Sequence, residues 1–188
     1  MQLHRQRAGA RTRRSVVAIM ASLVLLPALS GVAAGGGQAD VADVRRATAA
    51  FHDLDAALAA GYIQFYVCTE QPGVGTMGQH YANLGLVGDP AIDPLRPEVL
   101  VYEPKANGDG YRLVAVEYVT IQELWQGANG ATTPAVLGQD LSLTGAGNRY
   151  GMPPFFQRHL WLWEPNPAGL FADWNPNVSC RGDGDEGG

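Results

Sequence analysis

The sequence predicts an α+β fold, with an N-terminal helix packed on a curved, mainly antiparallel sheet in a single disulfide-tied domain. Residues 40–60 carry apolar side chains at helical spacing, and the chain beyond them alternates short apolar runs with glycine- and proline-rich turns. The turn sequence Asn-Gly-Asp-Gly at 107–110 separates two apolar runs, as is typical of a β-hairpin. One helix followed by several antiparallel strands belongs to the α+β class.

The expected elements follow from these patterns in order. The helix has Asp40 as its N-cap and Gly61 at its end. The segment 126–154 lacks regular patterns, and a stretch of that length in a compact domain usually has a function or covers something. The remaining expected elements are a strand at 62–67, turns at 69–79, a loop at 85–97, hairpin strands at 99–103 and 111–120, a strand at 159–163, and turns leading to Cys180.

Residues 1–34 have the three parts of a cleavable signal peptide. Arginines without any acidic residue precede an apolar run at 16–29, and small residues follow. This run is shorter than the about 20 residues that a membrane-spanning helix needs, so we expect cleavage after Ala34 and no stable membrane insertion afterwards. Export through the Sec route, or through the twin-arginine route because of Arg13 and Arg14, predicts a secreted or extracytoplasmic protein.

The chain expected after cleavage is acidic and suits one domain. None of the 18 acidic residues but five of the 13 basic residues lie within 1–34. An acidic surface argues against nucleic acid and anionic membranes as partners. We expect a flexible leader at 35–39, one α+β domain at 40–180, and a disordered tail at 181–188.

Cys68 and Cys180 are expected to form a disulfide. Two cysteines of one domain usually pair in an oxidising compartment, and no CxxC motif or nearby Cys-His pair indicates a metal site. A free thiol and a metal ligand are the alternatives.

Strand alternation predicts a polar site within apolar surroundings. Each of three expected strands places one ionisable side chain in line with apolar neighbours, and a buried carboxylate needs a partner. The sets expected to share a face are Val99, Val101 and Glu103; Leu113, Ala115, Glu117 and Val119; and His159, Trp161 and Trp163.

We therefore expect a metal or small-ligand site at His80, Glu103, Glu117 and His159, with His80 supplied by the turn after Gly78. Two histidines and two carboxylates suit a divalent ion such as zinc, manganese or iron, and they can leave a position open for water or substrate. Two alternatives stay open: a metal-free polar pocket, or carboxylates that face solvent or pair with arginines while the histidines are core groups.

Aromatic side chains supply a second set of candidates. They form the core or line a cavity for an apolar or sugar-like ligand. The expected ligand contacts are Tyr81, Asn83, Trp161 and Trp163.

Six short motifs together resemble a family of small secreted bacterial proteins of unknown function, over residues 43–180. The resemblance implies export and a single domain, and it brings no activity or cofactor. The motifs are Gly78-x-His80-Tyr81-x-Asn83, Pro97-Glu98-x-Leu100-Val-Tyr-Glu103-Pro104, Val116-Glu117-Tyr118, His159-Leu-Trp-Leu-Trp163, Asn166-Pro-x-Gly169-x-Phe171 and Asn175-Pro-x-Val178-x-Cys180.

Three functions follow as hypotheses. The first is an extracytoplasmic protein that binds a metal ion or small ligand at the His/Glu pocket. The second is a structural or interaction domain of the cell envelope without a site. The third is a metal-dependent enzyme that uses the same residues, with Glu103 or Glu117 as general base. No GxSxG, P-loop or Rossmann fingerprint indicates another chemistry.

Overall fold

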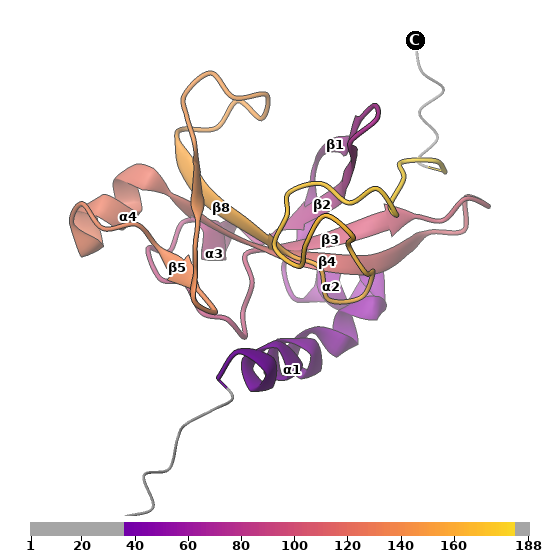
Figure 1. The fold of residues 1–188 in the computed structure, drawn as a ribbon, viewed down its shortest axis with the longest axis horizontal. Coiled ribbons are helices and arrows are strands. Elements are labelled where there is room, and N and C mark those ends of the chain that lie inside the picture. Colours follow the sequence, from indigo (N-terminus) through magenta and orange to yellow (C-terminus); the bar gives the residue numbers. More distant parts are fainter. Residues whose placement is uncertain (1–35, 183–188) are drawn as a thin grey trace, which may run out of the picture. The chain divides into compact units, whose positions relative to one another are not determined.

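A computed structural model describes residues 36–182, with side chains from residue 41 onward. The signal peptide expected at 1–34 and residues 183–188 of the expected tail lie outside the described residues. The fold is α+β, as predicted: helices cover a curled, half-barrel antiparallel sheet (Figure 1). Among the described residues, no helix has the length and apolar character needed to cross a membrane.

The N-terminal helical region has three parts instead of the one helix expected at 40–60. They are α1 (Gly36–Thr48), the 3-10 turn η1 (Ala49–His52) and α2 (Leu54–Ala59). Asp53 interrupts them because its backbone is extended, with φ −88° and ψ 113°, and its side chain accepts the N–H of Asp55. Asp53 therefore caps α2 and changes the direction of the chain between η1 and α2.

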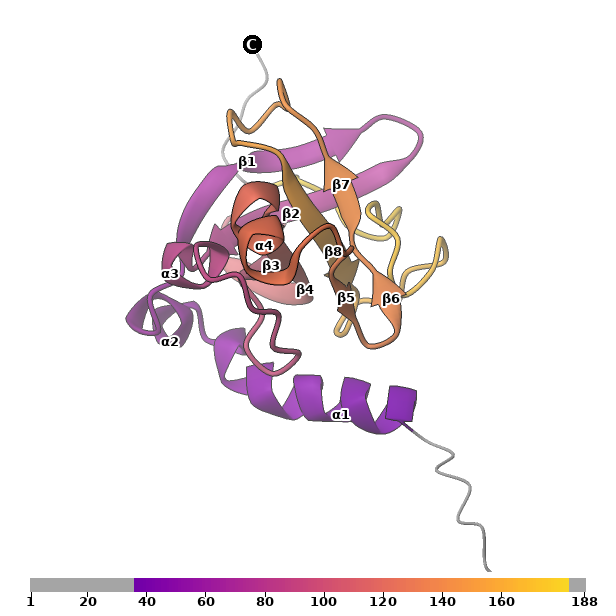
Figure 2. The same ribbon diagram turned by 90° about the vertical axis from the view of Figure 1, so that its left-hand side faces the viewer.

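The main sheet has six strands in the order β1-β2-β3-β4-β8-β7, and every neighbouring pair is antiparallel. A two-stranded ribbon, β5 with β6, stands beside it (Figure 2). The bounds are β1 (Ile63–Gln71), β2 (Gly75–Ala82), α3 (Leu84–Val87), β3 (Val99–Pro104), β4 (Tyr111–Ile121), α4 (Gln122–Asn129), β5 (Ala135–Val136), β6 (Gln139–Asp140), β7 (Ser142–Thr144) and β8 (Phe155–Leu160).

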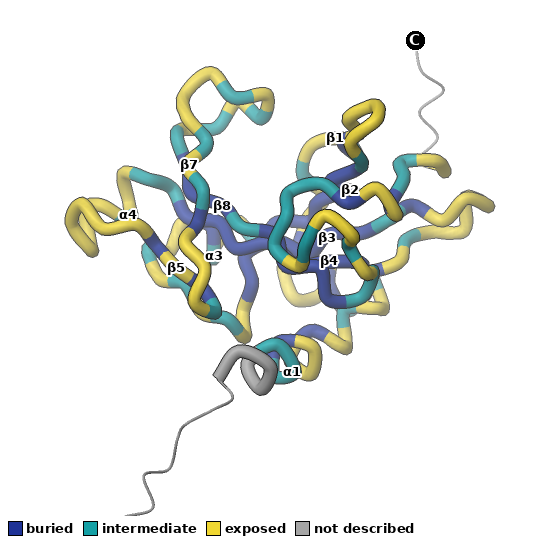
Figure 3. The backbone as a smooth tube through the Cα atoms, viewed as in Figure 1, coloured by how far each residue is buried: buried dark blue, intermediate teal, exposed yellow. Residues whose placement is uncertain are grey.

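The sheet buries apolar side chains on both faces, and the most buried stretches follow β2, β3, β4 and β8 (Figure 3). We call the two sides the helix face and the pocket face. The helix face packs against α1, η1 and α2, with Val44 of α1 buried against it, and includes Leu100, Tyr102, Leu113, Val116, Tyr118 and Leu160. The pocket face includes Ala82, Val99, Val101, Val114, Ala115, Val119, Phe155 and Trp161.

β2 occupies part of the segment 69–79, which the sequence predicted to consist of turns. β1 continues to Gln71, and only a short turn separates it from β2. Gly78 has φ +97°, and a Cβ there would lie 2.8 Å from the backbone oxygen of Tyr102. The glycines that suggested turns thus allow a strand to approach its neighbour closely.

A bulge in β4 changes which residues share a face. Val101 pairs with Ala115 but Tyr102 pairs with Leu113, so Val114 is an extra residue. Leu113 therefore lies on the helix face, although uninterrupted alternation predicted it beside Ala115 and Glu117.

The last strand lies earlier than the expected 159–163. β8 ends at Leu160, and the N–H groups of Trp163 and Glu164 both donate to the carbonyl of Val114, at 3.0 and 3.3 Å. Trp163 then packs on the helix face, away from His159 and Trp161.

The disulfide between Cys68 and Cys180 is confirmed. Cys68 lies within a large irregularity of β1, where Phe65 pairs with His80 but Thr69 pairs with Gly78. The side-chain amide of Gln79 donates to the carbonyls of this bulge, at 2.8 Å to Tyr66. The disulfide and Gln79 together hold the bulged edge of the sheet.

Candidate metal centre

Three strands bring His80, Glu117 and His159 together on the pocket face. Glu117 of β4 lies directly opposite His159 of β8. His80 of β2 is opposite Val101 of β3, so its imidazole lies across a strand to reach the others. The curl of the sheet and the short side chains of Val101 and Ala115 allow this approach.

The donor atoms of these residues converge. The two Nε2 atoms of His80 and His159 are 3.3 Å apart, and His80 Nε2 lies 3.5 Å from Glu117 Oε2. His159 Nδ1 lies 3.7 Å from Glu117 Oε1. One ligand atom from each residue lies within 4.8 Å of the other two.

The two separations from His80 Nε2, 3.3 Å to His159 Nε2 and 3.5 Å to Glu117 Oε2, are close to those between ligands of one metal ion. The contact at 3.7 Å belongs to Nδ1, the other ring nitrogen of His159. Two donors at 2.0–2.1 Å from a tetrahedral zinc ion lie about 3.3 Å from one another. Two imidazoles and one carboxylate are a donor set that zinc and ferrous iron both accept, and three protein ligands leave a position open. Glu103 is not part of this group.

Burial keeps all three groups uncharged when no cation is present. Desolvation lowers the pKa of His80 to about 3, the adjacent His159 contributes, and a backbone hydrogen bond at Gly78 opposes the shift. Desolvation likewise lowers the pKa of His159 to about 3, with Arg158 adding to it. It raises the pKa of Glu117 to about 8, with contributions from Asp173 and Glu98.

One nitrogen of the group has no hydrogen-bond partner in the folded protein. His159 is fully buried, and its Nδ1 makes no hydrogen bond. The nearest acceptors, on Glu117 and Asp173, lie at 3.7 and 3.9 Å, beyond hydrogen-bonding distance. Four other buried side-chain atoms of the described residues also lack a partner, on Gln79, Thr120, Gln157 and Trp163, so this nitrogen is informative only together with the clustered ligand atoms.

The indole ring of Trp161 packs against the imidazole of His159. The two rings stack with centroids 5.9 Å apart and planes at 13°. The indole N–H donates to the carbonyl of Ala172 at 2.6 Å, which anchors this tryptophan to the C-terminal segment. Trp161 therefore restricts the orientation of the His159 ring. It does not itself line the pocket.

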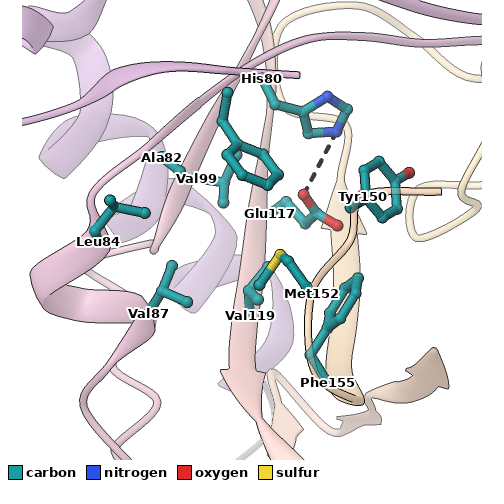
Figure 4. A pocket seen from close by; sticks show the side chains of 11 residues that line it. His80, Ala82, Leu84, Val87, Val99, Glu117, Val119, Tyr150, Met152 and Phe155 are labelled. Carbon is teal, nitrogen blue, oxygen red and sulfur yellow. Dashed lines mark ion pairs between the residues drawn. The ribbon is translucent and has the colours of Figure 1, made fainter. Parts of the chain in front are cut away.

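An apolar pocket opens onto the group, and His80 and Glu117 point into it (Figure 4). Its volume is about 160 Å³. The other lining residues are Phe65, Ala82, Leu84, Val87, Val99, Val119, Tyr150, Met152 and Phe155. His159 does not line the pocket and is fully buried behind His80 and Glu117.

Glu103 lies elsewhere, near the β3–β4 hairpin. Its carboxylate pairs with Arg112 at 2.5 Å and accepts the backbone N–H of Ser179 at 3.0 Å. Arg112 also pairs with Glu164, at 2.6 Å. Glu103 thus connects the hairpin to the C-terminal segment. Its pairing with Arg112 matches the alternative in which a carboxylate pairs with an arginine and does not bind metal.

Three expected ligand contacts also lie away from the pocket. Tyr81 packs on the helix face because it alternates with His80. Asn83 caps α3, accepting the N–H of Gly85, and donates to the carbonyl of Ala60. Trp163 stacks edge-on against His52, with ring centroids 4.4 Å apart.

Several pocket residues were not predicted individually. Tyr150 and Met152 come from the irregular segment 126–154, which was expected to cover something, and they form one wall of the pocket. Phe155 belongs to a strand whose pairing only the structure provides, whereas Phe65 was among the aromatic side chains expected to form the core or line a cavity.

Comparisons with known proteins add no relative: protein families, curated proteins and solved structures give no match to this chain. The functional argument therefore rests on the site itself.

Proposed function

We propose that this protein binds a divalent transition-metal ion, such as zinc, manganese or iron, through His80, Glu117 and His159, outside the cytoplasm. The observation that carries the proposal is the convergence of these side chains in a buried position, with one ligand atom from each within 4.8 Å of the other two. His80 Nε2 lies 3.3 Å from His159 Nε2 and 3.5 Å from Glu117 Oε2. A metal ion supplies the positive charge that allows Glu117 to ionise, and it accepts lone pairs from both imidazoles, which otherwise share a single contact between their Nε2 atoms at 3.3 Å.

The extracytoplasmic location is supported by two features. A disulfide persists in oxidising compartments and is rare in the cytosol. The basic and apolar pattern of residues 1–34 adds the expectation of a signal peptide. Membership in a family of small secreted bacterial proteins, suggested by the motifs, is part of the same proposal.

Elemental analysis of the purified, tag-free exported protein tests the metal site. We expect close to one metal ion per chain after incubation with zinc, manganese or iron salts and removal of unbound metal. The double variant His80→Ala/His159→Ala loses the ion because two of three ligands are gone. The variant His52→Ala is the matched control, since His52 is exposed and contacts Trp163.

Circular dichroism and the intact disulfide show whether each variant is folded. Metal that remains in a folded double variant, or is lost equally from His52→Ala, contradicts the proposal. Absence of bound metal from the parent after all three salts also contradicts it, and then favours the metal-free pocket or an interaction domain.

A further inference from the structure

The proposed metal ion leaves the identity of the pocket's occupant open, and this inference rests on that metal. We infer that the pocket binds small apolar monoanions of about benzoate size, with a carboxylate oxygen on the open position of the metal and an apolar body against the pocket wall.

The wall of the pocket determines the apolar body. Besides His80 and Glu117, the only polar group among the lining side chains is the hydroxyl of Tyr150, and it contacts Met77 Sδ at 3.5 Å. Its ring therefore faces the pocket while its oxygen is engaged elsewhere (Figure 4). A sugar or other polyol would leave its hydroxyl groups unpaired against valine, leucine and phenylalanine side chains.

The volume limits the size. A cavity of about 150 Å³ lined by apolar side chains holds one benzene molecule. The pocket has about 160 Å³, so a six-membered ring or a short branched chain fills it. Leu84, at its rim, is 56% exposed, so one side remains open to solvent.

Charge selects the monoanion. No arginine or lysine lines the pocket, so the protein offers an anion no cation of its own there. A divalent ion bound to the ionised Glu117 leaves one net positive charge, since the two histidines are neutral ligands. A single carboxylate cancels that charge in apolar surroundings, where uncompensated charge is costly.

The probes are benzoate, cyclohexanecarboxylate and gluconate, added to the metal-loaded and metal-free forms and followed by calorimetry. We expect the first two to bind the metal-loaded protein at least tenfold more tightly than the metal-free protein. Gluconate, a monoanion of polyol character, is expected to bind at least tenfold more weakly than benzoate.

A pocket-filling variant distinguishes binding in the pocket from binding elsewhere. Met152→Trp enlarges a side chain of the wall that lies outside the strands bearing the metal ligands. We expect this variant to keep its metal and lose benzoate affinity by tenfold or more. Leu143→Trp is the control, because Leu143 is 51% exposed on β7 and does not line the pocket.

The two proposals fail differently. If the parent holds metal but benzoate fails to bind, binds as well without metal, or is unaffected by Met152→Trp, the inference is overturned and the metal site stands. If gluconate binds as tightly as benzoate, the apolar selectivity is overturned. If the parent holds no metal, elemental analysis shows this before any probe is added, and both proposals fall.

Discussion

Glu98 and Glu117 are the two buried carboxyl groups among the described residues, and they are buried for different purposes. They are 2% and 6% exposed, and desolvation raises the pKa of each to about 8. Glu98 accepts the backbone N–H of Val119 at 3.0 Å. The nitrogens nearest to Glu117 belong to His80 and His159, at 3.5 and 3.7 Å.

The difference lies in their partners. The pairing of β3 with β4 ends at Val99 opposite Glu117, and the side chain of Glu98 supplies the acceptor for an N–H just beyond. Glu98 thus completes the sheet from within the protein. Glu117 faces two imidazoles that burial keeps neutral, and the cation that we propose would complete this set. Burial and pKa alone do not distinguish a structural carboxyl group from a functional one.

The helix face shows the same contrast with tyrosines. The hydroxyls of Tyr62, Tyr102 and Tyr118 donate to backbone carbonyls at 2.7, 2.7 and 2.8 Å. These three hydroxyls are satisfied by the fold, whereas Nδ1 of His159 on the pocket face and the indole N–H of Trp163 on the helix face have no hydrogen-bond partner.

Metal affinity should separate the two carboxyl groups by the largest margin. Glu117→Gln is expected to weaken metal binding on the order of 100-fold, because the ligand loses its charge. Glu98→Gln keeps an oxygen for Val119 and should leave affinity within about threefold, as measured by competition with a chelator. Equal losses in the two variants would show that both carboxyls act only through stability.

The pH dependence of stability should reveal Glu98 in the metal-free protein. Its pKa is about 8 in the fold and about 4.5 in the unfolded chain, so the folded state alone holds the proton between these values. Stability from this group is complete below pH 4.5 and is lost as pH rises toward 8.

The corresponding substitution, Glu98→Gln, should make the decline shallower by up to about 1.4 kcal/mol per pH unit between pH 5 and 8. Urea unfolding with a chelator present measures it, and histidines contribute equally to both proteins. Parallel stability curves for the variant and the parent would contradict the assignment.

Polar groups of the two faces should respond oppositely to apolar replacement. Tyr118→Phe removes a satisfied hydroxyl and should lower the free energy of unfolding by about 1 kcal/mol. His159→Leu removes an orphaned nitrogen, and without metal it should cost nothing or stabilise by up to about 1 kcal/mol. A larger loss from His159→Leu than from Tyr118→Phe would mean that the histidine is a satisfied core group.

Local patterns predicted much of this arrangement. The turn at 107–110 defined the β3–β4 hairpin, and period-two alternation placed Val99, Val101, Ala115 and Glu117 on one face. The helical character of the N-terminal region, the disulfide and the α+β class also follow from residue spacing and type, although the one helix expected at 40–60 is divided into three parts.

Features that depend on contacts between residues far apart in the chain could not be predicted from local sequence patterns. The glycine at 78 suggested a turn, because its close approach to Tyr102 exists only once β2 and β3 pair. The bulge at Val114 places the side chain of Leu113 on the helix face instead of the face of Ala115. Because β8 ends at Leu160, Trp163 also packs on the helix face and not beside His159. Glu103 was expected to share a strand face with Val99 and Val101 and to bind a metal ion. In the structure its carboxylate pairs with Arg112 instead.

The strand order also sets the sequence of events by which the group assembles. β2, β3 and β4 follow one another along the chain and bring His80 near Glu117 through the connections 83–98 and 105–110, each shorter than the segment before β8. β8 joins β4 only after residues 122–154 have been spanned, and closing longer loops is slower and entropically costlier. We therefore expect His159 to join the group late in folding, so that the proposed metal ion would be held only by molecules whose sheet is complete.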